Sequence, residues 1–127
     1  MKILVLETDK MFASNICRHL EVHGYKTDWQ VDPQEAIISV DVEPVDMVIM
    51  DVVLAGRSGV EFLYEFRSYP DWANVPIIIY SSVPAREVGD SAHGFEQINI
   101  KSYLYKPTTP IASLVAHVDA ILQPTPA

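Results

Sequence analysis

The chain has 127 residues, which is enough for one compact domain but leaves no room for a second. Its 49% hydrophobic and 20% charged residues are typical of a globular protein and argue against an intrinsically disordered chain. Seventeen acidic and nine basic residues give a formal charge of −8, without a basic patch, so we expect no direct binding to nucleic acids or to anionic membranes.

The apolar segments of the chain are too short for a membrane span or a signal peptide. None approaches the roughly 18 consecutive apolar residues that cross a bilayer, and Glu7 interrupts the first apolar run. The single cysteine, Cys17, cannot form an internal disulfide, so nothing in the sequence requires an oxidising compartment. We therefore expect a soluble, cytoplasmic protein.

Strand and helix patterns alternate from the start of the chain. The continuous apolar run at residues 3–6 predicts a strand that is buried on both faces. Apolar residues at the helical period follow, with Thr8 and Asp9 as candidate amino-terminal caps and Gly24 closing the helix. Residues 26–31 alternate between polar and apolar, which favours a strand at the edge of a sheet.

The same alternation continues through the middle of the chain. Pro33 stands where proline is tolerated in the first turn of a helix, and a short second helix is predicted there. The apolar run at 45–50 predicts a third strand. Ser58 is a candidate cap for a third helix, whose apolar face precedes a further buried strand at 75–80.

The carboxyl-terminal third of the chain is less regular. Two glycines within residues 84–100 predict that any helix there is short or irregular. A weak strand pattern at 103–105 precedes a final helix at about 110–122. We expect one domain over residues 1–122 and a flexible tail at 123–127.

This order of elements predicts an α/β fold. The predicted fold is a single doubly wound, five-stranded parallel sheet flanked by five helices, with right-handed crossovers. In such sheets the functional residues lie beyond the carboxyl ends of the strands.

Polar side chains follow several of the predicted strands. Asp51 is the one acid within seven otherwise apolar positions, and a buried carboxylate requires a cation or a set of hydrogen bonds. Lys106 could supply the opposite charge, and Glu7 with Asp51 could hold a hard divalent cation. The simpler alternatives are that Asp51 caps the following loop, that Lys106 is the exposed end of a strand, and that Ser81 is only a turn hydroxyl.

Four motifs in order resemble the receiver domain of two-component response regulators, and the resemblance covers residues 2–122. It implies a flavodoxin-like topology. The segments that carry the resemblance are Ile3-Leu4-Val5-Leu6-Glu7-Thr8-Asp9, residues 45–61 around Asp51, Val75-Pro76-Ile77-Ile78-Ile79-Tyr80-Ser81-Ser82, and Tyr103-Leu104-Tyr105-Lys106-Pro107.

The resemblance implies a role for each of these residues. Asp51 would accept a phosphoryl group from a histidine kinase or a phosphotransfer protein, with Lys106 and Ser81 contacting the phosphoryl oxygens. A magnesium ion would be held by Glu7, Asp51 and the backbone carbonyl of Val53, with Asp9 as a further candidate ligand. The domain would not be an enzyme beyond catalysing its own phosphorylation and dephosphorylation.

The resemblance also implies an output. Ser81 and Tyr103 would switch together and change the surface offered to a downstream protein partner, and such domains often form homodimers.

Three departures from the family pattern stand out. Thr8 replaces the second acid of the first loop, which weakens the expected magnesium affinity. Ala55 replaces a usual proline, and the interval from Ser81 to Lys106 is longer than usual. Thr8 and the irregular stretch at 84–100 favour the alternative of a pseudo-receiver, an interaction domain that signals without phosphorylation, whereas Ala55 does not touch the chemistry.

Other classes of protein fit less well. An aspartate-nucleophile phosphatase requires a second acid where this chain has Val53, and the acidic loop at 7–10 lacks the run of hydroxyl residues of a flavodoxin-like cofactor site. His19 and His23 have helical spacing but no third ligand, so we interpret them as part of a solvated helix face.

Overall fold

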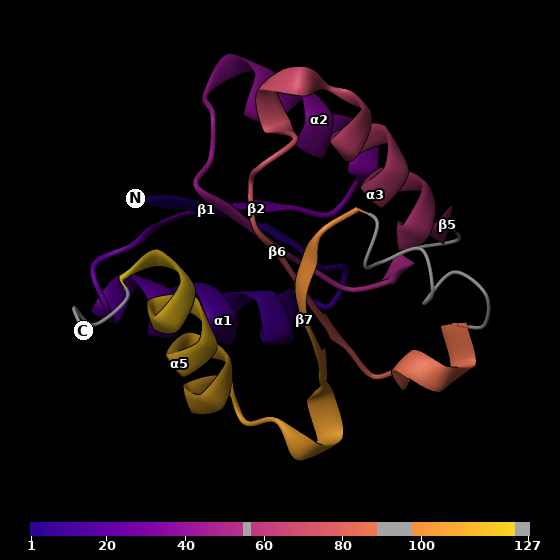
Figure 1. The fold of residues 1–127 in the computed structure, drawn as a ribbon. Coiled ribbons are helices and arrows are strands. Elements are labelled where there is room, and N and C mark those ends of the chain that lie inside the picture. Colours follow the sequence, from indigo (N-terminus) through magenta and orange to yellow (C-terminus); the bar gives the residue numbers. More distant parts are fainter. Residues whose placement is uncertain (55–56, 89–97, 124–127) are drawn as a thin grey trace.

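The computed structural model describes residues 1–54, 57–88 and 98–123, with the backbone only at residue 57. Its main sheet has five strands, all parallel, in the order β2-β1-β3-β6-β7 (Figure 1). The strands are β1 (Lys2–Leu6), β2 (Lys26–Gln30), β3 (Met47–Met50), β6 (Ile77–Ser81) and β7 (Ile100–Tyr105). The predicted α/β fold with a five-stranded parallel sheet is confirmed.

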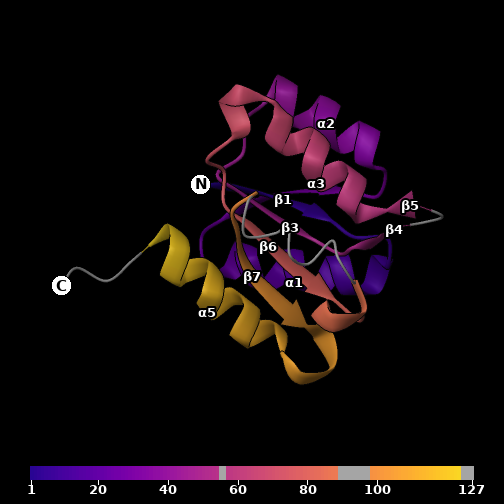
Figure 2. The same cartoon turned by 45° about the vertical axis from the view of Figure 1, so that its right-hand side comes forward.

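Helices cover both faces of the sheet (Figure 2). The α-helices of the described residues are α1 (Lys10–Val22), α2 (Pro33–Val42), α3 (Gly59–Ser68) and α5 (Ile111–Leu122). Side chains of α2 and α3 pack in one core cluster, and side chains of α1 and α5 pack in the other. The doubly wound arrangement follows, with a separate apolar core on each face of the sheet.

The helix starts follow the predicted capping residues. Asp9 accepts a hydrogen bond from the backbone N–H of Phe12, and Ser58 accepts one from the N–H of Val60. Gly24 lies just after α1 and has a φ of +92°, a backbone conformation that residues other than glycine rarely adopt. These local signals explain where α1 and α3 begin and where α1 ends.

Two parts of the structure differ from the prediction. The described residues contain four α-helices where five were expected. The region of the missing helix shows only the 3-10 helix η2 (Ala85–Val88), and residues 89–97, which include its two glycines, lie outside the described residues. The strand β7 begins at Ile100 rather than at 103. The prediction missed its first residues because Lys101 and Ser102 are polar and interrupt the apolar run.

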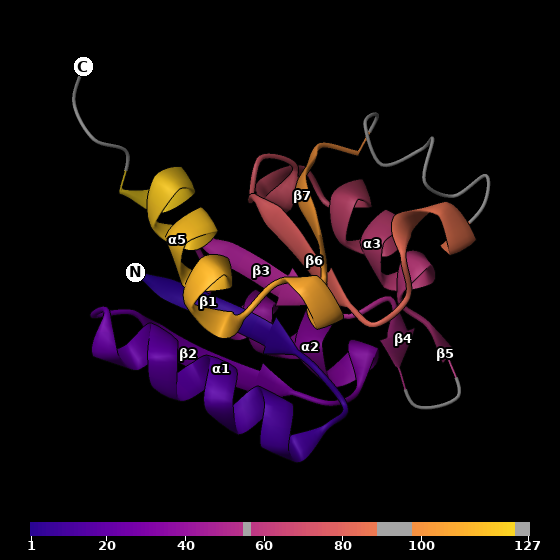
Figure 3. The ribbon, with the colours of Figure 1, turned by 90° about the horizontal axis from the view of Figure 1, so that it is seen from below.

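Smaller elements complete the described chain. A two-stranded antiparallel pair, β4 (Val53–Leu54) and β5 (Arg57–Ser58), precedes α3 (Figure 3). Short 3-10 helices, η1 (Pro70–Trp72) and η3 (Lys106–Thr108), follow α3 and β7. None of the helices in the described residues has the length and apolar character that a membrane span requires. Ala55 and the tail residues 124–127 also lie outside the described part of the chain.

Candidate functional site

Four polar side chains come together where strands of the parallel sheet end. Glu7 follows β1, Asp51 follows β3, Ser81 is the last residue of β6, and Lys106 follows β7. Because the strands are parallel, their carboxyl ends meet at one edge of the sheet. The structure thus places all four residues in one cluster, which the sequence pattern predicted for them.

Asp51 is buried, with 7% of its surface exposed, and both carboxylate oxygens accept hydrogen bonds. Oδ1 accepts from the hydroxyl of Ser81 at 2.6 Å and from the backbone N–H of Val53 at 3.0 Å. Oδ2 accepts from the ammonium of Lys106 at 2.8 Å. A positive charge and two further donors therefore offset the cost of burying this carboxylate.

The ammonium of Lys106 bridges two carboxylates. Besides Asp51, it donates to Oε1 of Glu7 at 2.5 Å, and the side chain of Lys106 is only 7% exposed. Burial alone lowers the pKa of Lys106, but the hydrogen bonds to Asp51 and Glu7 outweigh burial, and the net pKa lies above its usual value. Lys106 is therefore a fixed cation in the cluster.

Glu7 is the most enclosed acid of the cluster, with 4% of its surface exposed. Its Oε2 accepts a hydrogen bond from the backbone N–H of Asp9 at 3.1 Å. The carboxylate of Asp9 caps α1 through the N–H of Phe12, at 3.0 Å. Among the described residues, no buried side-chain nitrogen or oxygen lacks a hydrogen-bond partner, so the cluster is satisfied as it stands.

Ser81 connects Asp51 to the start of the next loop. Its hydroxyl, fully buried, accepts a hydrogen bond from the backbone N–H of Val83 at 3.1 Å. The carbonyl of Val83 in turn accepts from the hydroxyl of Tyr103 at 2.6 Å. Tyr103 is half-buried, and burial raises its pKa. A short series of hydrogen bonds therefore leads from Asp51 through the β6 loop to β7.

An open recess exposes this cluster on the surface, and Thr8, Asp9, Phe12, Val53 and Ser82 help to line it. The carboxylates of Glu7 and Asp51 are hard oxygen donors of the kind that Mg²⁺ binds in proteins, and Val53, whose carbonyl the resemblance assigns to the ion, also lines the recess. This donor set fits a magnesium ion that keeps several waters. However, Thr8 contributes no carboxylate, and the described residues contain no group of three acids, histidines or cysteines that could hold a metal.

Two residues of the site were not singled out from the sequence. Gly59 lies against the backbone of Asp51, and a Cβ atom there would come within 2.7 Å of the Asp51 carbonyl oxygen. The ring of Phe12 lies 4.4 Å from Nζ of Lys106. Phe12 fits the helical apolar period of α1 and packs against the core cluster of α1 and α5, so the sequence pattern carries no signal that it also borders the site.

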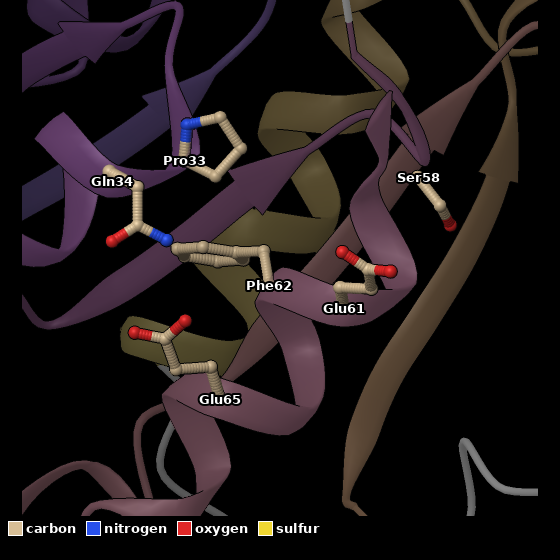
Figure 4. A pocket seen from close by; sticks show the side chains of 6 residues that line it. All are labelled: Pro33, Gln34, Ser58, Glu61, Phe62 and Glu65. Carbon is tan, nitrogen blue, oxygen red and sulfur yellow. The ribbon is translucent and has the colours of Figure 1, made fainter. Parts of the chain in front are cut away.

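A second recess lies between α2 and α3 (Figure 4). It is lined by Pro33, Gln34, Ser58, Glu61, Phe62 and Glu65. It includes two glutamates but no basic side chain, and none of the four clustered residues. The chemistry that the sequence indicated is therefore found in the first recess.

Comparison with known proteins places these observations in a family. Residues 3–119 match the response regulator receiver domain family. The chain is 31% identical over 124 residues to the transcriptional regulatory protein YvrH of Bacillus subtilis, covering 97% of this chain and 49% of YvrH. It is 25% identical to the phosphate regulon regulatory protein PhoB of Escherichia coli, covering 96% and 52%. The chain thus spans about half the length of these relatives.

Solved structures show the same fold. A two-component response regulator from Clostridium difficile superimposes with a TM-score of 0.82 at 24% identity, over 97% of this chain and 96% of the other. The response regulator TrrA of Thermotoga maritima, solved in complex with Mg²⁺ and BeF, gives a TM-score of 0.78 at 22% identity, over 95% and 98%. These similarities extend to nearly the whole chain.

Proposed function

The chain belongs to the response regulator receiver domain family, and from this premise we propose that Asp51 accepts a phosphoryl group from a phosphohistidine of a histidine kinase or phosphotransfer protein. Receiver domains act in two-component signalling and are generally not enzymes.

One observation carries the proposal. A single ammonium, that of Lys106, lies 2.5 Å from Glu7 and 2.8 Å from Asp51, while Ser81 donates to the other oxygen of Asp51. This arrangement offers a nucleophilic carboxylate, a fixed cation and a hydroxyl donor in the lining of one recess. Phosphoryl transfer depends mainly on such positioning and on neutralising the phosphoryl oxygens.

The transfer step uses these groups directly. An oxygen of Asp51 attacks phosphorus in line, so that a P–O bond forms while the P–N bond of the phosphohistidine breaks, and the bonding electron pair leaves with the histidine nitrogen. Lys106 lies close enough to Asp51 to neutralise charge on the phosphoryl oxygens during this step. A magnesium ion held by Glu7, Asp51 and the Val53 carbonyl would supply further neutralising charge.

The proposed output begins at Ser81. After transfer, its hydroxyl would donate to a phosphoryl oxygen instead of Oδ1 of Asp51. Since Val83 donates to Ser81 and accepts from Tyr103, a displacement of Ser81 reaches Tyr103 through one intervening residue. We expect this displacement to shift the population of two surface conformations that a downstream protein distinguishes.

A second candidate function is that of a pseudo-receiver, which signals through protein contacts alone. Thr8 favours it, because a neutral hydroxyl stands at a metal-binding position of the family. The complete set of Asp51, Ser81 and Lys106 favours phosphorylation instead.

Intact mass spectrometry distinguishes the two functions. The protein is incubated with acetyl phosphate over a range of Mg²⁺ concentrations, with Asp51→Asn as the control. A gain of one phosphoryl mass that the variant lacks supports phosphorylation. The absence of any gain at every Mg²⁺ concentration favours the pseudo-receiver.

A further inference from the structure

The ring of Phe12 lies against the ammonium of Lys106 and forms one wall of the recess. Nζ of Lys106 is 4.4 Å from the ring centroid, and Phe12 is half-buried in the first turn of α1. Phe12 also meets the buried Tyr80 edge to face, with 5.9 Å between their centroids. The centroid of Tyr80 is itself 5.9 Å from Nζ. One side of the ammonium is therefore aromatic.

The rings of Phe12 and Tyr80 lie beside the part of the ammonium that the carboxylates do not contact. An ammonium has three N–H donors, and two of those of Lys106 are accepted by Glu7 and Asp51. The face of an aromatic ring is electronegative and attracts a cation within about 6 Å of its centroid. In a side chain that is only 7% exposed, this attraction replaces solvation that water would otherwise provide.

The backbone of α1 fixes the ring and the carboxylate of Glu7 relative to each other. The N–H of Phe12 donates to Oδ1 of Asp9 at 3.0 Å, and the N–H of Asp9 donates to Oε2 of Glu7 at 3.1 Å. Lys106 contacts both Glu7 and Phe12. The contacts therefore form a closed series from Glu7 through Asp9 and Phe12 to Lys106 and back to Glu7. The position of the ammonium is thus determined from the helix start as well as from Asp51.

We propose that Phe12 is a positioning residue, whose ring holds the ammonium of Lys106 between Glu7 and Asp51. Its relevance to phosphoryl transfer rests on the function proposed above. The contact between the ring and the ammonium, in contrast, is testable without any phosphoryl donor.

The first test uses the unaltered protein. In NMR spectra of protein with ¹³C-labelled lysine, the ε-methylene protons of Lys106 should resonate upfield of those of Lys101, an exposed lysine of β7, because protons over a ring face are shielded. Phe12→Leu should abolish the upfield shift and Phe12→Tyr should retain it. An ordinary chemical shift for Lys106 in the unaltered protein overturns the proposal, even if no variant folds.

The second test is a double-mutant cycle on stability, with Phe12→Leu and Lys106→Met. If the ring stabilises the ammonium, the two substitutions should be coupled by about 2- to 30-fold in the unfolding equilibrium constant. Ile121→Ala is the control, because Ile121 packs against the same core cluster as Phe12. Its effect should add to that of Lys106→Met without coupling. Equal coupling in both cycles overturns the proposal, because packing alone would then explain it.

The third test separates the proposal from the proposed function. Phe12→Leu should lower the maximal rate of labelling by acetyl phosphate, with little change in the half-saturating concentration, because the nucleophile and the recess remain. If the unaltered protein is never labelled, the phosphorylation proposal fails while the contact between ring and ammonium can still stand. If Phe12→Leu is labelled as fast as the unaltered protein, Phe12 has only a structural role and the positioning proposal is wrong.

Discussion

The ammonium of Lys106 lies 2.8 Å from Oδ2 of Asp51, although 55 positions separate the two residues in the chain. Parallel strands bring them together, because Asp51 follows the central strand β3 and Lys106 follows the edge strand β7. Since both side chains are nearly excluded from water, their ion pair depends on its own geometry and on the further hydrogen bonds of Ser81 and Glu7.

Removing the cation should therefore destabilise the fold strongly. We expect Lys106→Met to lower the free energy of unfolding by about 3–5 kcal/mol, because it leaves two buried carboxylates without the cation that they share. Lys101→Met, at an exposed position of the same strand, serves as the control and should change stability by less than about 0.5 kcal/mol. Urea denaturation measures both, and a loss of equal size in the two variants would contradict the buried ion pair.

Ser81 should transmit the state of Asp51 to Tyr103. Because Ser81→Ala removes a fully buried hydroxyl with two hydrogen bonds, it should cost about 1–3 kcal/mol of stability. Beryllofluoride with Mg²⁺, a phosphoryl mimic, should shift the NMR signals of the Tyr103 ring in the unaltered protein but not in Ser81→Ala. Ser82→Ala, at the exposed neighbour, should retain the response, and loss of the response in both variants would argue against a specific role of Ser81.

Thr8 should limit the affinity for magnesium. A carboxylate added at this position by Thr8→Asp should increase Mg²⁺ affinity by at least about tenfold, since a tenfold change corresponds to only ~1.4 kcal/mol. Thr8→Asn, which adds a neutral side chain of similar size, is the matched control. Isothermal titration calorimetry compares the three proteins, and an unchanged affinity in Thr8→Asp would show that position 8 does not face the ion.

Tyr25 should make stability fall at alkaline pH. Burial, and then its hydrogen bond to Asp119, raises the pKa of Tyr25 above the ordinary value of 10.0. The unfolded chain therefore loses this proton at a lower pH than the folded protein. It follows that the contribution of Tyr25 is complete below about pH 10 and is lost as pH rises toward the folded pKa.

Tyr25→Phe tests this expectation. The variant should lose less stability than the unaltered protein between about pH 9 and 11, as measured by urea denaturation at several pH values. Tyr64→Phe, at an exposed tyrosine of α3, should leave the pH dependence unchanged. Identical pH dependence in Tyr25→Phe and the unaltered protein would show that Tyr25 does not cause the loss of stability at alkaline pH.

Much of the fold was predictable because its inner strands are buried on both faces. β1, β3 and β6 read as continuous apolar runs, and the capping residues Asp9 and Ser58 mark the starts of two helices. β7 was only partly predictable, because an edge strand with polar residues at Lys101 and Ser102 has no continuous apolar run. The pairing of β7 with β6 defines where this strand begins, and a local sequence pattern does not show that pairing.

The candidate site was predictable to a similar extent. Asp51 was conspicuous as an acid among apolar residues, and the rule for parallel sheets indicated where its partners should lie. The contribution of Phe12 was not predictable, because an apolar residue at the helical period has the same sequence signal whether it faces the core or a cation. The close approach of Gly59 to Asp51 likewise depends on the packing of α3 against β3.

Locating the phosphoryl group tests the central claim most directly. After incubation with acetyl phosphate and Mg²⁺, borohydride reduces an aspartyl phosphate to the alcohol homoserine with release of phosphate, and peptide mass spectrometry then identifies the modified position. We predict homoserine at position 51 alone, and none in Lys106→Met treated in parallel. Homoserine at another acid, or at no position under any Mg²⁺ concentration, would contradict the assignment of Asp51 as the phosphoryl acceptor.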